Sequence, residues 1–166
     1  MLTQRDKARA KIWTRLWQQH WDTPPAWDSL SEIIRLALLR ETVNLQRPLI
    51  LEAGCGSARI SARLAENSAR VVLLDITPAA LRIAKANCRQ AILVQGSVHR
   101  LPFAQVFDLI WNAGVLEHFN KTEQRQILDE FSKVLRPGGS IVVFTPFAGS
   151  LLYRIAKYFL ERTGGW

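Results

Sequence analysis

The sequence is poor in residues that mark covalent or metal-based chemistry. Only two of its 166 residues are cysteine, Cys55 and Cys88, and their positions indicate neither a disulfide framework nor a metal site. No apolar run approaches the roughly 20 residues of a membrane span, and the first residues lack the apolar core of a signal peptide. We therefore expect a cytoplasmic protein without a bound metal.

Two common phosphate-binding motifs are also incomplete. Gly54 and Gly56 fit the first two glycines of the dinucleotide motif G-x-G-x-x-G, but Arg59 occupies the third position. The Gly-Lys-Ser/Thr ending of the P-loop is absent. The glycine turn thus offers no anchor for a pyrophosphate or triphosphate.

Acidic residues are fewer than basic ones, 14 against 22, and the net charge is +8. Such a charge attracts nucleic acid, anionic lipid or acidic substrates. Because no nucleic-acid-binding motif accompanies it, we favour a basic solvated surface and do not expect nucleic acid as a partner. The length suits one domain with one core.

The glycine turn follows a short apolar run that reads as a strand, Leu49–Ala53. Glu52 closes this run, and Asp75 closes the next one. A carboxylate at a strand end repels phosphate and suits a cation or a hydroxyl, whereas an acidic residue placed like Asp75 binds ribose hydroxyls. A ligand with a ribose, a cationic end and no phosphate fits this pattern, and S-adenosylmethionine has these features.

Five segments, in order over residues 48–147, carry a resemblance to a known family. They are Leu-Glu-Ala-Gly-Cys-Gly-Ser-Ala, Leu-Leu-Asp-Ile-Thr-Pro, Gln-Gly-Ser-Val-His-Arg-Leu-Pro-Phe, Phe-Asp-Leu-Ile-Trp-Asn-Ala-Gly-Val-Leu-Glu-His-Phe and Leu-Arg-Pro-Gly-Gly. In these segments the chain resembles the class I S-adenosylmethionine-dependent methyltransferases, in particular the group that includes quinone-biosynthesis enzymes. The resemblance implies an α/β, Rossmann-like, doubly wound sheet of about five parallel strands, ordered 3-2-1-4-5, with helices on both faces.

The resemblance also implies a donor site. Glu52 would bind the methionine part, the turn of Ala53, Gly54, Cys55 and Gly56 would admit the donor, and Asp75 would bind the ribose. Ile76 would pack on the adenine face, with Ser97 and Val98 beside the base and Asn112 near the point where donor and acceptor meet. Two residues depart from the family pattern: Ser97 replaces a usual aspartate that accepts from the adenine amino group, and Ala58 replaces a common glycine.

His118 follows the fourth predicted strand. It is a candidate general base because its ordinary pKa lies near neutrality. A structural histidine explains it as well, and we favour that interpretation.

Strands alternate with helical patterns through the central part of the chain, which predicts a parallel sheet. We expect a helical cap over 1–47, a core over 48–147 and an amphipathic helix over 148–166, without the two further strands that the family adds. The predicted strands are 49–53, 71–75, 91–95, 107–111 and 141–145. Helix starts are predicted at Asp28, Thr77 and Asn120, and the first of these helices would turn Leu30, Ile33, Ile34, Ala37, Leu38 and Leu39 inward.

Tryptophans at positions 13, 17 and 21 share one face of an N-terminal helix rich in lysine and arginine. We favour packing of this face on the domain. Two alternatives stay open, a lid over the acceptor pocket and an anchor at a membrane surface, since this composition is typical of interfacial helices.

These patterns predict methyl transfer from S-adenosylmethionine to a small-molecule or lipid-like acceptor, with a homo-oligomer as a further expectation. The alternative is a non-catalytic S-adenosylmethionine-binding module or a truncated methyltransferase. The acceptor atom is left open between carbon, oxygen and nitrogen.

Overall fold

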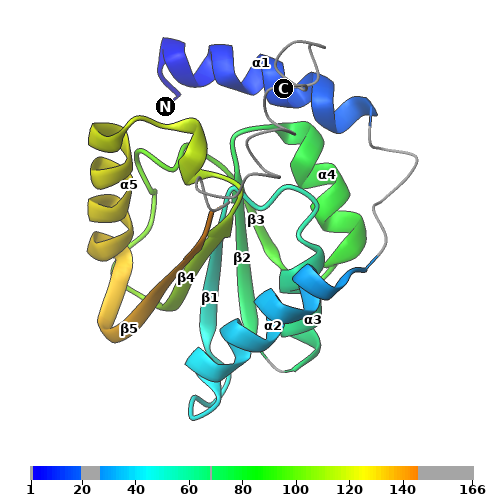
Figure 1. Cartoon of the computed structure of the whole chain (residues 1–166), viewed down its shortest axis with the longest axis vertical. Coiled ribbons are helices and arrows are strands. Elements are labelled where there is room, and N and C mark those ends of the chain that lie inside the picture. Colours follow the sequence, from blue (N-terminus) through cyan, green and yellow to red (C-terminus); the bar gives the residue numbers. More distant parts are fainter. Residues whose placement is uncertain (1, 20–26, 68, 146–166) are drawn as a thin grey trace, which may run out of the picture.

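The computed structural model describes residues 2–19, 27–67 and 69–145, which form one five-stranded parallel sheet. The strand order is β3-β2-β1-β4-β5, as predicted. In chain order the strands are β1 Leu49–Ala53, β2 Arg70–Asp75, β3 Ile92–Gln95, β4 Phe107–Ala113 and β5 Leu135–Phe144. Because all pairings are parallel, the carboxyl ends of the strands meet at one end of the sheet, beneath the first helix (Figure 1). Chain order reverses between β1 and β4, the position where open α/β sheets bind ligands.

Helices cover both faces of the sheet, which confirms the doubly wound class. Ile50 and Leu109 pack against Leu38 on the face covered by helices α2 to α4, whereas Leu51 and Ile110 pack against α5 on the other face. Helix α1 crosses the carboxyl end of the sheet (Figure 1). The helices are α1 Gln4–Gln19, α2 Ser29–Thr42, α3 Arg59–Glu66, α4 Pro78–Asn87 and α5 Lys121–Val134, with a short 3-10 helix at Leu116–His118.

The predicted helix starts are confirmed by their capping hydrogen bonds. The Asp28 carboxylate accepts from the Ser31 amide at 2.7 Å, and the Thr77 hydroxyl accepts from the Ala80 amide at 3.2 Å. Asn120 and Glu123 form a reciprocal capping box at α5. Local sequence therefore fixes where these helices begin.

Replacing Asn120 with alanine is expected to lower the free energy of unfolding by about 1 kcal/mol, because the Glu123 amide loses its acceptor. Chemical denaturation measures this change. The exposed neighbour Lys121, replaced by alanine, is the matched control and is expected to change stability by less than about 0.5 kcal/mol. Equal effects of the two variants would contradict the capping assignment.

The fifth strand begins earlier than predicted. Leu135 follows α5 directly and pairs with Phe107, and regular pairing resumes only at Ser140 opposite Leu109. The residues between them loop out as a bulge that includes Gly138 at a φ of 80°. Helix and strand thus adjoin without a linker, which residue patterning did not indicate.

The inward face predicted for α2 is only partly correct. Ile34 and Leu38 are buried against the sheet, but Leu30 and Ile33 are 62% and 61% exposed. A single helix can turn only one stripe toward the sheet, so apolar residues outside that stripe stay at the surface. The predicted helix over 148–166 and Trp21 lie outside the described residues.

None of the helices within the described ranges is long and apolar enough to cross a membrane.

Candidate functional site

The carboxyl ends of four neighbouring strands and the underside of α1 enclose a cavity of about 510 Å³. This volume lies within the range of small-molecule sites. Most of the residues predicted as a site from sequence line it together: Glu52, Gly54, Cys55, Gly56, Asp75, Ile76, Ser97, Val98 and His118. Residues separated by up to 66 positions in the sequence are therefore gathered at the expected end of the sheet.

Two predicted site residues do not reach this cavity. Ala53 is fully buried in the core beside Leu51. Asn112 is also fully buried, and neither polar atom of its side chain has a hydrogen-bond partner among the described residues. The structure thus places both behind the cavity wall.

The turn after β1 requires glycine at both positions. Gly54 has a φ of 81°, and a Cβ there would lie 2.6 Å from Val115. Gly56 has a φ of 49°, and a Cβ there would lie 2.6 Å from the Trp17 ring. Left-handed backbone angles and these close approaches both exclude a side chain. Ala58 also has a positive φ, 54°, which explains why glycine suits this position.

Replacing Gly56 with alanine is expected to destabilise the protein more than replacing Gly138 with alanine. Both glycines have positive φ, but nothing lies within 4 Å of a Cβ at Gly138, so that variant measures backbone strain alone, about 1–2 kcal/mol. At Gly56 the added methyl group would also displace Trp17, at an additional cost of about 1–3 kcal/mol. Urea titration of both variants makes the comparison, and equal losses would show that Trp17 does not rest on the turn.

Asp75 connects the glycine turn to the start of α4. Its Oδ2 accepts from the Gly56 amide at 3.0 Å, and its Oδ1 accepts from the Thr77 amide at 2.8 Å and the Thr77 hydroxyl at 3.0 Å. Burial raises the pKa of Asp75, and these hydrogen bonds only partly oppose that rise. A carboxylate offers about four acceptor sites, so roughly one is left for a ligand in the cavity.

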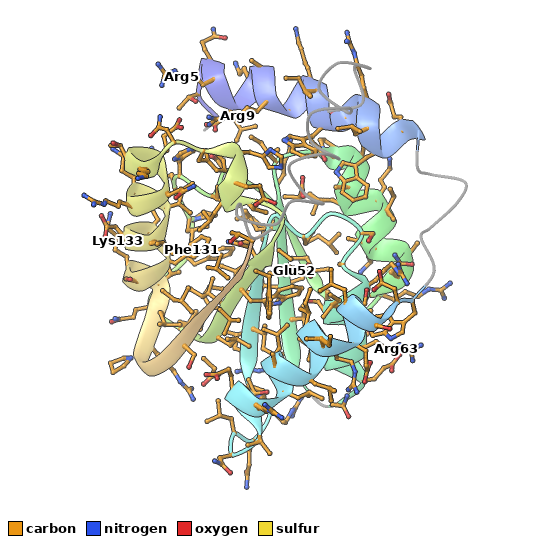
Figure 2. All side chains as sticks on the ribbon, in the orientation of Figure 1. Arg5, Arg9, Glu52, Arg63, Phe131 and Lys133 are labelled. Carbon is orange, nitrogen blue, oxygen red and sulfur yellow. The ribbon has the colours of Figure 1, made fainter. Side chains whose placement is uncertain are left out.

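Glu52 is nearly buried near the middle of the molecule, at the edge of the cavity (Figure 2). Loss of hydration raises the pKa of its carboxyl to about 8; the neighbouring Ser61 side chain opposes this rise, and the charge of Asp75 adds to it. Its Oε2 has no hydrogen-bond partner among the described residues. A cationic ligand group would satisfy this oxygen and favour the ionised form.

Cys55 lines the same wall, but burial raises the pKa of its thiol well above the usual range. A thiol held in this neutral form is a poor nucleophile. Cys55 therefore shapes the turn rather than supplying a reacting group.

Helix α1 forms the roof of the cavity. Its lining residues include Asp6, Arg9, Trp13 and Trp17. The ring of Trp13 meets that of His118 edge-on, with 4.9 Å between the centroids. The tryptophan face of α1 therefore packs on the domain and covers the cavity through the same contacts, although the sequence suggested these two roles as alternatives.

Arg9, on the roof helix α1 (Figure 2), connects this helix to the opposite wall of the cavity. Its guanidinium donates to Glu123 at 3.1 Å, lies 3.2 Å from His99 and stacks 4.4 Å from the Phe119 ring centroid. Neither Arg9 nor Asp6 was predicted from the sequence as a site residue. The spacing of Thr3 and Asp6 matches a helix-start motif, which would have marked Asp6 but not its place at the cavity.

Sequence comparisons identify the family. A family model described as a methyltransferase domain matches residues 51–143. An uncharacterised methyltransferase of Synechocystis sp. is 37% identical over 91 residues, covering 54% of this chain and 43% of that protein. A malonyl-[acyl-carrier protein] O-methyltransferase of Pseudescherichia vulneris is 31% identical over 130 residues, covering 76% of this chain and 51% of that protein. The chain spans about half the length of these curated relatives.

Solved structures share the fold at lower identity. A protein from Pyrococcus horikoshii superposes with a TM-score of 0.69 at 23% identity, over 84% of this chain and 71% of that one. An N-methyltransferase from Bradyrhizobium japonicum, in complex with S-adenosyl-L-homocysteine, gives 0.66 at 23% identity, over 78% and 71%. With the matched domain model and the observed strand order, the chain belongs to the methyltransferase-domain family, within the class I S-adenosylmethionine-dependent methyltransferases.

Proposed function

We propose that this protein transfers a methyl group from S-adenosylmethionine to a small-molecule or lipid-like acceptor. The observation that carries the proposal is the pair of carboxylates, Glu52 and Asp75, on adjacent strand ends around a glycine turn in one cavity. The unpartnered Glu52 oxygen suits the cationic methionine end, and the remaining acceptor site of Asp75 suits a ribose hydroxyl. These two acceptor sites require a cation and a hydroxyl group, and neither requires a phosphate group on the ligand.

In this proposal the residues of the cavity position the methyl donor and the acceptor, and none of them acts as a nucleophile. When bound, S-adenosylmethionine supplies an electrophilic methyl group whose departure leaves a neutral sulfur. Little charge then needs stabilising, and alignment of donor and acceptor accounts for most of the acceleration. In this proposal Glu52 and Asp75 hold the two ends of the donor, Ile76 and Val98 flank the base, and α1 excludes water.

His118 is the candidate for accepting a proton from the acceptor. It lines the cavity near Gly114, at the end of β4. Its edge-on contact with Trp13 also gives it a packing role. If the methyl acceptor has no proton to remove, His118 has only the packing role.

The apolar part of the cavity lining supports an apolar acceptor. It includes Ile12, Trp13, Leu16, Val115 and Phe119. Acceptors to test first are acyl-carrier-protein thioesters with a free carboxyl group, because the Pseudescherichia vulneris relative is a malonyl-[acyl-carrier protein] O-methyltransferase. Quinone-like phenols form the second class, on the basis of the family resemblance.

Contact with a membrane surface is a further part of the proposal. The lining tryptophans, Trp13 and Trp17, turn toward the cavity and not away from it. What supports it is the basic character of α1 around them. A homo-oligomer is likewise proposed only from the sequence, and sedimentation velocity measures it directly.

Calorimetric titration with S-adenosylmethionine and S-adenosylhomocysteine tests the donor site, and transfer of a labelled methyl group across the two acceptor classes tests the reaction. Saturable one-to-one binding followed by label transfer is expected. Absence of binding to either ligand would overturn the proposal. Binding without transfer to any acceptor would instead favour the non-catalytic binding module.

A further inference from the structure

A carboxylate from the roof helix reaches the part of the cavity where the adenine base would lie. Asp6 lines the cavity and is only 4% exposed. Its Oδ1 accepts a hydrogen bond from the Ser97 hydroxyl at 2.8 Å. These two residues lie 91 positions apart in the sequence, so only the fold brings them together.

The remaining contacts of Asp6 leave part of its acceptor capacity unused. Its Oδ2 accepts from the Thr3 amide at 2.9 Å and the Thr3 hydroxyl at 2.8 Å. With Ser97 this makes three donors for about four acceptor sites. Burial opposes ionisation, but the hydrogen bonds from Thr3 and Ser97 and the nearby His99 outweigh it, so the pKa of Asp6 lies below its usual value.

No lysine or arginine among the described residues forms an ion pair with Asp6. Arg9, a basic residue of α1 that lines the cavity, contacts Glu123 and His99 instead. A nearly buried carboxylate that forms no ion pair with a lysine or an arginine is stabilised by each further donor that it gains. The cavity is the side from which such a donor can come.

The placement of the neighbouring groups identifies that donor. Asp75 at the end of β2 is the proposed ribose site, and β3, which ends just before Ser97, is the next strand outward. Ile76, Val98, Ser97 and Asp6 line the same cavity, so a base that continues from the proposed ribose site past Ile76 and Val98 would present its edge to Ser97 and Asp6. The serine hydroxyl already donates its proton to Asp6, so the carboxylate is the stronger acceptor at this edge.

We propose that Asp6 accepts a hydrogen bond from the exocyclic amino group of the adenine base, with Ser97 holding the carboxylate in position. This inference rests on the proposed donor function and adds a specificity-determining residue to it. The roof helix then becomes part of the donor site, and recognition of adenine requires the roof to be closed.

The test compares two ligands that differ only at this edge. S-Adenosylhomocysteine carries the amino group, whereas S-inosylhomocysteine carries an oxo group, which repels a carboxylate. Calorimetry of the unmodified protein is expected to show tenfold or greater preference for S-adenosylhomocysteine, about the effect of one hydrogen bond to a charged acceptor. In Asp6→Asn the preference is expected to fall to about one, because an amide can donate to the oxo group.

The control separates recognition from docking of the helix. Thr3→Ala removes the hydroxyl that caps α1 and that donates to Asp6 Oδ2, but it keeps the carboxylate and its hydrogen bond from Ser97, so it is expected to weaken both ligands equally. A preference unchanged in Asp6→Asn, or equal binding of both ligands by the unmodified protein, would overturn the inference while leaving the donor site standing. Failure of the unmodified protein to bind S-adenosylhomocysteine would instead overturn the proposed function.

A second variant provides a rescue. Ser97→Asp combined with Asp6→Asn moves the carboxylate from the roof to the loop after β3. The double variant is expected to regain the preference for the amino ligand that Asp6→Asn lost. Regain of the preference is a result that a purely structural role of Asp6 does not produce.

Discussion

Replacing Asp75 with alanine is expected to weaken binding of S-adenosylhomocysteine by about a hundredfold. The variant loses the carboxylate proposed to hold the ribose, and hydrogen bonds to a charged acceptor contribute about 1.5–3 kcal/mol each. It also removes the acceptor for the Gly56 amide, so the turn that receives the donor is less well fixed. Calorimetric titration at a temperature where the variant remains folded measures the effect.

The same substitution has a cost in stability that must be measured separately. The Gly56 and Thr77 amides lose a buried acceptor, at about 1–3 kcal/mol for each unsatisfied group. Asp75→Asn keeps an acceptor oxygen and is expected to recover part of the stability but less of the binding. Asp129→Ala, at an exposed position on α5, is the control and is expected to change neither quantity. An unchanged affinity of Asp75→Ala for S-adenosylhomocysteine would contradict the proposed donor site.

The second large effect concerns Glu52 and the dependence of stability on pH. The folded protein holds this carboxyl at a pKa of about 8, compared with an ordinary value of 4.5. The folded state therefore keeps the proton over the pH range in which the unfolded state has lost it. The stabilisation from this group is complete below about pH 4.5 and is lost as the pH rises toward 8.

Each pH unit in that window is expected to cost about 1.4 kcal/mol of unfolding free energy from this group, roughly 5 kcal/mol over the whole window. Glu52→Gln keeps the shape of the protonated acid but cannot ionise. As the pH rises, the unmodified protein is thus expected to lose stability relative to Glu52→Gln, so that the unfolding free energy of the variant becomes the larger of the two. A difference that stays constant between pH 5 and 8 would contradict the assignment.

Ligand binding gives an independent measurement on the same carboxyl. A cationic methionine end near Glu52 favours its ionised form, so binding at pH 7 is expected to release a proton. Titrations in buffers with different enthalpies of ionisation count that proton. Glu52→Gln is expected to abolish the buffer dependence.

The positions of the strands along the chain were predictable because they depend on local patterns. Short apolar runs closed by Glu52 and Asp75 marked β1 and β2, and the caps at Thr77 and Asn120 marked the helices between strands. A parallel sheet then requires the strand ends to share one edge. For the same reason the glycine turn and both carboxylates could be assigned to one site in advance.

The start of β5 and the exposed residues of α2 were not predictable in this way. Leu135 continues an apolar helical pattern, yet its backbone pairs with Phe107. Leu30 and Ile33 look like core residues, and only the single contact stripe of α2 leaves them at the surface. In both cases a tertiary contact overrides the local preference.

By itself the sequence determined the strands and the floor of the cavity, because these follow from the spacing of apolar runs, glycines and carboxylates in the chain, and its resemblance to the methyltransferase family implied the strand order. Only the tertiary structure decided how the cavity is roofed. The contacts of Asp6 with Ser97 and of Arg9 with Glu123 join residues 91 and 114 positions apart. No periodicity or spacing encodes such pairs, because they depend on the angle at which α1 crosses the end of the sheet.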